Sequence, residues 1–249
     1  MSMMQSEKRT AFILSAGLGT RLKEMTHDKP KALVELNGLP LLEHVINNLI
    51  SQNFNHFVIN IHHFGDKIIE FINSKKYENV KIEISDEREM LYDTGGGLLK
   101  ALPYFSDSKA VLIHNVDIIT DIDFQSVYND FVKCGDAAWL FTQNRDNKRK
   151  LVFDSHDNFV GRFNIDTKEY DGDIDLKDEF KLLSFSGLHL IKPEYFSSFQ
   201  LIKCYIFDLY REIAKDNKVR SKFIQPNYWF DLGTQEQLKE ASSWLLSQK

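Results

Sequence analysis

Residues 10–21 read TAFILSAGLGTR, and this segment, together with the residues after it, decides the class of fold. The first six residues are almost all apolar or β-branched, which predicts a buried strand over Thr10–Ser15. The strand leads at once into Gly17-Leu18-Gly19-Thr20-Arg21. Glycines in such a turn let backbone amides approach a bound anion, because no Cβ is in the way, and an arginine adds a donor fork that suits phosphate. The segment therefore indicates either an anion-binding loop or a plain strand-to-helix turn with a surface arginine.

Short apolar runs alternate with amphipathic segments as far as residue 143. Strands are predicted at residues 10–15, 56–61, 80–85, 110–115 and 137–142, and helices at residues 41–50, 67–72, 97–102 and 124–134. This alternation predicts an α/β fold with a Rossmann-like, mostly parallel sheet flanked by helices. Ligands of such sheets bind beyond the carboxyl ends of the strands. The glycine loop and Asn115-Val116-Asp117 both come directly after such strands, so we expect them to lie together.

The later part of the chain has a different pattern, with charged, hairpin-like segments from residue 143 to residue 181. Strands are predicted at residues 150–154, 159–163 and 181–191, a helix at 204–215, a strand end at 228–233 and a closing helix at 235–246. No linker rich in Gly, Ser or Pro marks a domain boundary. We therefore expect a single domain over residues 1–249, in which residues 8–143 form one half, an antiparallel addition at 144–233 the other, and residues 234–249 the closing helix.

The composition excludes several classes of protein. The 249 residues include 31 basic and 36 acidic side chains, a net charge of −5, and this balance argues against nucleic-acid binding. Two cysteines are too few for a disulfide framework or a four-ligand zinc site. The longest apolar run, Ala137–Phe141, is far too short to span a membrane, and residues 1–9 lack the apolar stretch of a secretory signal. We expect a cytoplasmic protein with no nucleic-acid or membrane partner.

Two common phosphate-binding motifs do not fit the glycine loop. A dinucleotide fingerprint needs a small residue three positions after the second glycine, where this chain has Leu22. A Walker A loop needs Gly-Lys followed by Ser or Thr, and no Gly-Lys pair occurs in the sequence. A second basic segment, Lys29-Pro30-Lys31, comes after the loop. Its proline favours an extended Lys29, so Lys31 is able to project back over the loop, although such triplets are commonly solvated turns.

Together these segments resemble the signature of the sugar-1-phosphate nucleotidylyltransferases. The glycine loop and Pro30-Lys31 match the G-x-G-T-R…P-K pattern of that family, and Trp229-Phe230-Asp231-Leu232-Gly233-Thr234 matches its later motif. Three further matches fall at the expected intervals: Asp93-Thr94-Gly95-Gly96-Gly97, Asn115-Val116-Asp117 and Phe185-Ser186-Gly187. The resemblance covers nearly the whole chain. The short length and the triple glycine are most similar to the N-acetylmuramate-1-phosphate uridylyltransferase branch.

This resemblance implies an enzyme that transfers a nucleoside monophosphate from a nucleoside triphosphate to a sugar 1-phosphate and releases pyrophosphate. Residues 8–143 would bind the nucleotide and residues 144–233 the sugar. Such chemistry depends on positioning and on neutralising two polyanions. Arg21 and Lys31 are the implied catalytic residues, on the departing phosphates and near the α-phosphate. The implied nucleotide-binding residues are Ala16, Gly17, Leu18, Gly19, Thr20, Thr94, Gly95, Gly96 and Asn115, and the implied sugar-binding residues are Gly97, Ser186 and Gly187.

The resemblance also implies Mg²⁺, held by Asp117 and Asp231. Mg²⁺ prefers oxygen ligands, usually one or two carboxylates together with phosphate oxygens and water. Either aspartate is alternatively a helix cap, although Asp121 or Asp123 and Thr234 stand closer to the following helices. Three glycines placed ahead of a helix would leave bare backbone against which a base or ribose lies.

The chain departs from the family pattern in two places. Val116 stands where glycine usually precedes the metal-binding aspartate, and no Glu-Lys-Pro triplet occurs in the middle segment. Arg162 and Lys150 are candidates for the missing cation on the sugar phosphate. UTP with N-acetylmuramate 1-phosphate is the favoured substrate pair, and GTP with a mannose or heptose 1-phosphate the alternative. A non-catalytic nucleotide-sugar sensor, or a structural protein that binds a partner, is a further alternative, and the sequence leaves the oligomeric state open.

Overall fold

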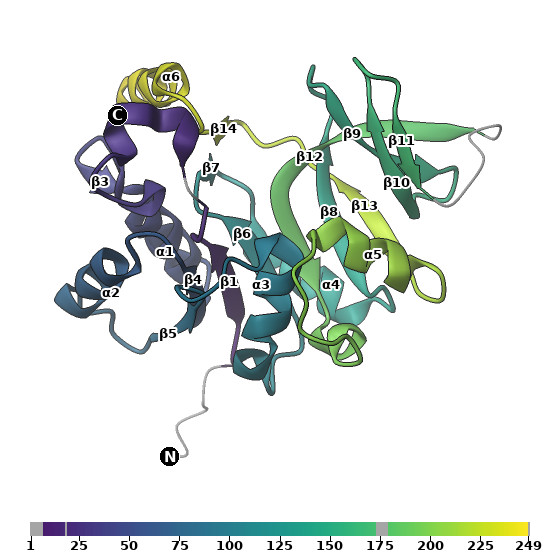
Figure 1. Cartoon of the computed structure of the whole chain (residues 1–249), viewed down its shortest axis with the longest axis horizontal. Coiled ribbons are helices and arrows are strands. Elements are labelled where there is room, and N and C mark those ends of the chain that lie inside the picture. The colour runs from purple at the N-terminus through teal and green to yellow at the C-terminus, as the bar shows by residue number, and fades with distance from the viewer. Residues whose placement is uncertain (1–6, 18, 173–178, 249) are drawn as a thin grey trace.

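The computed structural model describes residues 7–17, 19–172 and 179–248 and is shown in Figure 1. Within these residues one ten-stranded sheet passes through both halves of the chain, in the order β11-β10-β9-β12-β6-β1-β4-β5, and β8 and β13 continue it from β12. Its strands are β1 (Thr10–Leu14), β4 (His56–Ile61), β5 (Lys81–Asp86), β6 (Val111–Asn115), β8 (Ala138–Gln143), β9 (Arg149–Asp154), β10 (Phe159–Asn164), β11 (Tyr170–Gly172), β12 (Phe180–Ile191) and β13 (Val219–Phe223).

The part of the sheet formed by β6, β1, β4 and β5 is parallel, as the β-α alternation predicts. Strand β1 lies between β4 and β6 and is parallel to both, and β5 is parallel to β4. The carboxyl ends of these four strands therefore lie at one edge. Strand β12 runs antiparallel to both β6 and β8 and lies between them. Strand β8 is therefore separated from β6, β1, β4 and β5, although all five strands belong to residues 8–143. The α/β class with a mostly parallel sheet is thus confirmed.

Helices cover both faces of the sheet (Figure 1). The buried apolar residues form two clusters. Helices α1 (Leu41–Ser51) and α4 (Phe124–Lys133) pack against the first cluster, and helices α3 (Asp93–Ala101) and α5 (Ile206–Ala214) pack against the second. The helices are α1 (Leu41–Ser51), α2 (Gly65–Ser74), α3 (Asp93–Ala101), α4 (Phe124–Lys133), α5 (Ile206–Ala214) and α6 (Gln235–Ser247), and the 3-10 turns are η1 (Thr20–Thr26), η2 (Lys31–Leu33), η3 (Leu102–Phe105) and η4 (Pro193–Phe196). Among the described residues, no helix is both long enough and apolar enough to cross a bilayer.

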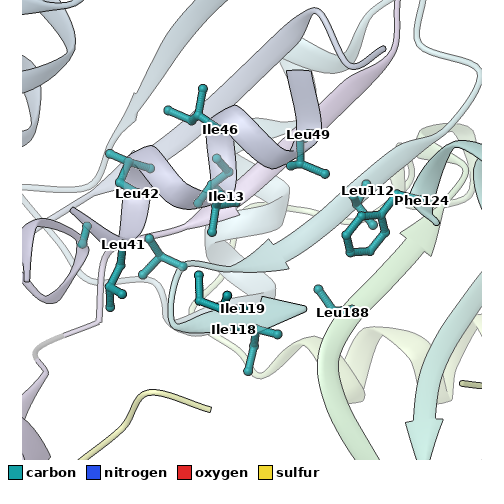
Figure 2. Packing of buried hydrophobic residues seen from close by; sticks show 14 of the residues in the cluster. Ile13, Leu41, Leu42, Ile46, Leu49, Leu112, Ile118, Ile119, Phe124 and Leu188 are labelled. Carbon is teal, nitrogen blue, oxygen red and sulfur yellow. The ribbon is translucent and has the colours of Figure 1, made fainter. Parts of the chain in front are cut away.

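The alternation of side chains along β1 divides the core between the two faces. Ala11 and Ile13 belong to the cluster beneath α1, whereas Phe12 belongs to the cluster beneath α3 and α5, because successive strand residues point to opposite faces. Figure 2 shows Ile13 beneath α1, close to Ile46 and above the residues of the short strand β7 (Ile118–Thr120). Burial on both sides makes β1 a rigid support for the loop after it.

Two small ribbons lie outside the main sheet. Strands β2 (Glu35–Leu36) and β3 (Leu39–Pro40) form a hairpin before α1. Strand β14 (Trp229–Asp231) pairs antiparallel with β7, and this pairing joins the last part of the chain to the segment after β6. Neither β7 nor β13 is among the strands predicted from the sequence. The predicted start of the third helix is also wrong: α3 begins at Asp93, so the three glycines lie inside the helix instead of ahead of it.

Candidate active site

A cavity of about 310 Å³ lies at the carboxyl edge of the parallel strands. Leu14, Asn60 and Asn115 reach it from the ends of β1, β4 and β6, and Glu87 reaches it from the segment after β5. The full lining consists of Leu14, Ser15, Ala16, Gly17, Gly19, Thr20, Arg21, Lys31, Asn60, Glu87, Leu91, Asp93, Thr94, Asn115, Val116, Asp117 and Gly233. The early loop, Asn115 and Asp117 are therefore brought to one place, as their positions after strands led us to expect.

The loop after β1 is held by a side chain from the neighbouring strand. Oδ1 of Asn60 accepts hydrogen bonds from the backbone amides of Ser15, at 2.6 Å, and Ala16, at 3.2 Å. Gly19 adopts a left-handed φ of 63° at the start of η1, a conformation that glycine adopts without strain. The loop is thus shaped by β4 and by glycine before any ligand is bound. Leu18, which the resemblance assigns to the nucleotide, lies outside the described residues.

Lys31 projects from the other side of the loop toward Asp117. The extended conformation of Pro30 starts η2 at Lys31, and the Lys31 side chain runs past Gly19, where an added Cβ would lie 3.1 Å from Lys31 Cβ. Its ammonium group donates a hydrogen bond to Oδ2 of Asp117, and both side chains are largely buried. A point charge held in this way is suited to neutralise an anion at the cavity.

Asp231 is placed beside Asp117 by backbone pairing. In the β7–β14 ribbon Asp231 is opposite Ile118, and the amide of Leu232 donates to the carbonyl oxygen of Asp117 at 2.9 Å. Oδ1 of Asp231 is buried and has no hydrogen-bond partner among the described residues. Two carboxylates that are far apart in sequence therefore lie next to each other. Of these two carboxylates, only that of Asp117 forms an ion pair with a described cation.

The charges around the site shift the pKa of Asp231. Burial, followed by the negative charge of Asp117, raises the pKa of the Asp231 carboxyl above its usual range. The positive charges of Lys31, Arg21 and Arg145 oppose this rise by a smaller amount. A buried carboxylate with an unpaired oxygen beside a second carboxylate is the donor set that a hard divalent cation prefers, with phosphate oxygens and water as its other ligands. The two aspartates fit such an ion, and no group of three or more ligand side chains occurs among the described residues.

The nearby helix caps leave both aspartates free for this role. Asp123 caps α4, accepting from the amide of Ser126 at 2.8 Å, and Thr234 caps α6, accepting from the amide of Gln237. Arg21 lies against Gly233, where an added Cβ would stand 2.8 Å from the guanidinium carbon. The glycine thus makes room for the arginine beside the end of β14. Arg21 is itself exposed at the cavity.

The sequence profile of the family described as nucleotidyl transferase matches residues 10–151 of this chain. The chain belongs to the nucleotidyl transferase family. The N-acetylmuramate alpha-1-phosphate uridylyltransferase of Caulobacter vibrioides is 30% identical over 227 residues, which cover 87% of this chain and 88% of that protein. The D-glycero-alpha-D-manno-heptose 1-phosphate guanylyltransferase of Campylobacter jejuni is 29% identical over 232 residues, which cover 91% and 95%.

A solved structure also has this fold. HddC from Yersinia pseudotuberculosis, complexed with GMP-PN, matches with a TM-score of 0.75 at 20% identity, over 95% of this chain and 99% of that one. The family resemblance inferred from the sequence motifs, that of the sugar-1-phosphate nucleotidylyltransferases, is confirmed, and this nucleotidyl transferase is an enzyme.

The three glycines of the nucleotidyl transferase face protein instead of the cavity. A Cβ on Gly95 would lie 2.8 Å from the sulfur of Cys204, and one on Gly96 would lie 2.3 Å from the carbonyl oxygen of Ile202. The amide of Gly95 donates to the carbonyl of Cys204 at 2.9 Å. These glycines let α3 approach the segment before α5 closely, which is a packing reason for their presence. A nucleotide-binding role for Gly95 and Gly96 stays a prediction.

Thr94 and Gly97 flank Gly95 and Gly96 in the sequence, but only Thr94 lines the cavity. Thr94 lines the cavity, and its hydroxyl accepts from the amide of Ile206 at 3.1 Å, so it also anchors the start of α5. Gly97 is buried, and an added Cβ would lie 2.8 Å from Oε1 of Glu87. Gly97 therefore makes space for a polar group beneath the cavity, and its contact with the sugar stays a prediction.

Ser186 and Gly187 lie on β12, where it runs beside β6. Gly187 has a φ of 80° within an irregular stretch of β12, and a Cβ there would lie 3.0 Å from the amide nitrogen of the Asn115 side chain. The hydroxyl of Ser186 is buried without a partner among the described residues. Neither residue lines the cavity, although Gly187 touches one that does. Their predicted contact with the sugar is not tested by this arrangement.

The buried pair of Asn60 and Glu87 was not predicted from the sequence. Nδ2 of Asn60 donates to Oε1 of Glu87 at 2.8 Å, and Oε2 of Glu87 accepts from the amide of Tyr92 at 3.2 Å. Glu87 is fully buried, and burial raises the pKa of its carboxyl. The pair links the loop after β1 to the start of α3. A polar residue near the end of the apolar run HFVINI was the only signal for Asn60.

A second pair that was not predicted, Arg145 and Trp229, belongs to residues 144–233. The guanidinium carbon of Arg145 lies 3.8 Å from the centre of a Trp229 ring, and Nη2 donates to the carbonyl of Phe185 at 2.5 Å. Burial lowers the pKa of Arg145, and the negative charge of Asp231 opposes this shift. Arg145 and Trp229 are far apart in the sequence, so no local sequence pattern predicts their contact.

The two cations that the sequence suggested for the sugar phosphate already have partners. Nζ of Lys150 is buried and donates to the hydroxyl of Ser184, at 2.8 Å, and to the carbonyl oxygen of Arg145. Arg162 forms ion pairs with Asp171 and Asp208. Lys150 therefore holds the segment that carries Arg145, and the charge of Arg162 is neutralised by carboxylates.

Proposed function

We propose that this nucleotidyl transferase transfers a uridylyl group from UTP to N-acetylmuramate 1-phosphate and releases pyrophosphate. The relative from Caulobacter vibrioides, whose name states this activity, supports the choice because it matches over most of both chains. We further propose that residues 1–249 act as one domain, with nucleotide-binding residues in 8–143 and sugar-binding residues in 144–233. The cytoplasm is the compartment that we propose, since Cys134 and Cys204 are both free thiols.

One observation carries the proposed chemistry: Lys31, Asp117 and the unpaired oxygen of Asp231 meet at the carboxyl edge of a parallel sheet. In open α/β sheets this edge is where phosphate-bearing ligands bind. Attack of the sugar phosphate oxygen on the α-phosphorus of the nucleotide forms one P–O bond as the bond to pyrophosphate breaks. The protein has to hold two polyanions in line, and this site offers both cations and carboxylates for that purpose.

Each residue has a place in that scheme. Asp117 and Asp231 would hold Mg²⁺, which when bound offsets the charge on the reacting phosphates. Arg21, exposed at the cavity, would contact the departing phosphates through its donor fork. Backbone amides at Gly17 and Gly19 would bind phosphate oxygens. The ammonium of Lys31 is already fixed at the cavity, so little of its rotamer freedom has to be lost when the α-phosphate arrives.

A guanylyltransferase is the second candidate. The heptose 1-phosphate enzyme of Campylobacter jejuni matches this chain at nearly the same identity and over an even larger share. Bases that are recognised largely through backbone groups leave few characteristic side chains in the sequence. The described lining residues Asn115 and Thr94 offer polar atoms that suit more than one base.

A pyrophosphate-release assay distinguishes these candidates. The purified chain is incubated with Mg²⁺ and each of UTP, GTP, CTP, ATP and dTTP against N-acetylmuramate, N-acetylglucosamine, mannose and heptose 1-phosphates. We expect the fastest turnover with UTP and N-acetylmuramate 1-phosphate, and its loss when EDTA is added. Faster turnover with GTP and a mannose or heptose 1-phosphate would favour the second candidate. No turnover of any pair by folded protein would contradict the proposed reaction.

A further inference from the structure

Arg145 is a fixed arginine in the connection between β8 and β9. Its guanidinium lies on the ring system of Trp229, and its Nη2 is anchored to the carbonyl of Phe185. Trp229 is held in turn, because its Nε1 donates to the carbonyl of Ser186 at 3.0 Å. Stacking and hydrogen bonding together limit the rotamers available to a long side chain. Arg145 is therefore positioned in advance of any ligand.

The charge of Arg145 is not paired within the described part of the chain. Its Nε is buried without a hydrogen-bond partner, and the group forms no ion pair with a described carboxylate. Arg88, Arg162 and Arg220, by contrast, each have a carboxylate partner. Arg21, at the cavity, and the exposed Arg149 likewise form no ion pair with a described carboxylate. Leaving a half-buried cation unpaired costs free energy unless a bound anion offsets it.

The position of Arg145 relative to the reaction centre depends on β14. Trp229 and Asp231 are two residues apart on that strand, so their side chains share one face. Arg145, stacked on Trp229, is thus on the side of β14 to which Asp231 points. Arg21 and Lys31 approach the aspartates from the nucleotide-binding half, and Arg145 approaches them from the opposite half.

We propose that Arg145 binds the phosphate group of the sugar 1-phosphate and orients its attacking oxygen toward the nucleotide. This assignment rests on the proposed function and deepens it by naming the cation that the acceptor meets. It takes the role for which the sequence suggested Arg162 or Lys150. A fixed guanidinium whose charge interacts with that of Asp231 suits a phosphate monoester, because its planar donor groups match phosphate oxygens.

The test is a comparison of kinetic constants for Arg145→Ala, Arg145→Lys and the wild-type enzyme, with the best substrate pair. For Arg145→Ala we expect KM for the sugar 1-phosphate to rise about 10- to 150-fold, the loss typical of a charge-assisted hydrogen bond. KM for the nucleoside triphosphate should stay within about twofold of wild type, a change below 0.5 kcal/mol. Arg145→Lys keeps the charge but lacks the planar donor fork. Its KM for the sugar 1-phosphate should lie between the values for the wild-type enzyme and Arg145→Ala.

Arg220→Ala is the matched control, because it removes an arginine of the same half that is paired with Asp136. It should leave both constants near the wild-type values. Three outcomes would overturn the assignment: an unchanged KM for the sugar phosphate in Arg145→Ala, a selective rise in KM for the nucleotide, or a rise in KM for the sugar phosphate in Arg162→Ala alone.

A binding measurement separates failure of this assignment from failure of the proposed function. N-acetylmuramate, N-acetylglucosamine, mannose and heptose 1-phosphates are titrated calorimetrically into protein loaded with the α,β-methylene analogue of UTP or GTP, so that no turnover is needed. Binding by wild type that is weakened in Arg145→Ala supports the assignment even where turnover is absent. Equal binding by wild type and Arg145→Ala overturns the assignment alone, and absence of any binding to wild type overturns both.

Discussion

The ammonium of Lys31 donates to Oδ2 of Asp117 across 86 residues of sequence, and this contact neutralises one of the two aspartates at the site. Asp231, joined to the same segment by the β7–β14 ribbon, keeps a buried carboxylate oxygen without a partner among the described residues. The ligand-free protein therefore holds one paired and one unpaired carboxylate side by side. Their removal should have opposite effects on stability and the same effect on activity.

We predict that Asp231→Asn raises the melting temperature of the ligand-free protein, because it removes a half-buried charge that forms no ion pair with a described residue and is repelled by Asp117. Asp117→Asn should lower the free energy of unfolding by about 1–3 kcal/mol, since it leaves Lys31 unpaired and largely buried. Both variants should lose turnover. Differential scanning calorimetry and the pyrophosphate assay measure the two effects.

Asp107→Asn is the control for that pair, because it removes an exposed charge at a left-handed position that asparagine tolerates. It should change neither the melting temperature nor the turnover appreciably. Melting temperatures that fall equally in Asp117→Asn and Asp231→Asn would show that the two carboxylates are equivalent, against the arrangement described.

Lys31→Ala tests the cation on the nucleotide side. We expect turnover to fall at least about tenfold, which corresponds to 1.4 kcal/mol of activation free energy. The neighbouring Lys29→Ala removes the same charge on the other side of Pro30 and should keep turnover near the wild-type value. Equal losses in the two variants would mean that only the general positive potential of this segment matters.

Gly97→Ala tests the packing beneath the cavity. The new Cβ would meet Oε1 of Glu87 at 2.8 Å, so we expect a loss of about 1–3 kcal/mol in the free energy of unfolding. Gly135→Ala is the matched control, because nothing lies within 4 Å of its added Cβ. Urea unfolding measures both. A variant of Gly97 that is as stable as wild type and raises only KM for the sugar would favour the contact that the resemblance implies.

Two buried histidines make stability depend on pH. Burial lowers the pKa of His114 to about 4 and that of His189 to about 3, from an ordinary value of 6.5. As the pH falls below 6.5 the unfolded chain takes up a proton at each position and the native chain does not, so the free energy of unfolding decreases. Each histidine contributes a slope of about 1.4 kcal/mol per pH unit between about pH 6 and pH 4.

His189→Gln keeps a polar group for its buried partner Tyr210 and should remove one such slope from the curve of unfolding free energy against pH. Urea unfolding at several values from pH 7 to pH 4.5 measures this difference. The exposed His63→Gln should leave the curve unchanged. An identical slope in wild type and His189→Gln would contradict a neutral, buried imidazole at this position.

The parts of the fold that the sequence predicts are those with local causes. The apolar runs at Thr10–Ser15 and His56–Ile61 predict strands because a strand buried on both faces of a sheet needs such a pattern. The ends of β1 and β6 predict a shared site because the carboxyl ends of parallel strands meet at one edge. The placement of Asp117 and the glycine loop is explained by this rule, whereas Lys31 is placed by the turn that starts after Pro30.

The parts that the sequence does not predict depend on contacts between distant segments. Gly95 and Gly96 look like an exposed loop, yet their constraint comes from Ile202 and Cys204, which approach α3 from far along the chain. Arg145 carries no motif of its own, and its position depends on Trp229. Stacking and close backbone approach leave no periodic pattern, so only the folded structure reveals them.

The central claim is that Asp117 and Asp231 together hold one divalent cation beside the nucleotide. The most direct measurement is a titration with Mn²⁺ followed by electron paramagnetic resonance, in the presence of the α,β-methylene analogue of UTP, on wild type, Asp117→Asn and Asp231→Asn. We predict one bound Mn²⁺ per wild-type chain and at least a tenfold weaker site in each variant, about 1.4 kcal/mol. Undiminished Mn²⁺ binding in either variant would contradict the claim.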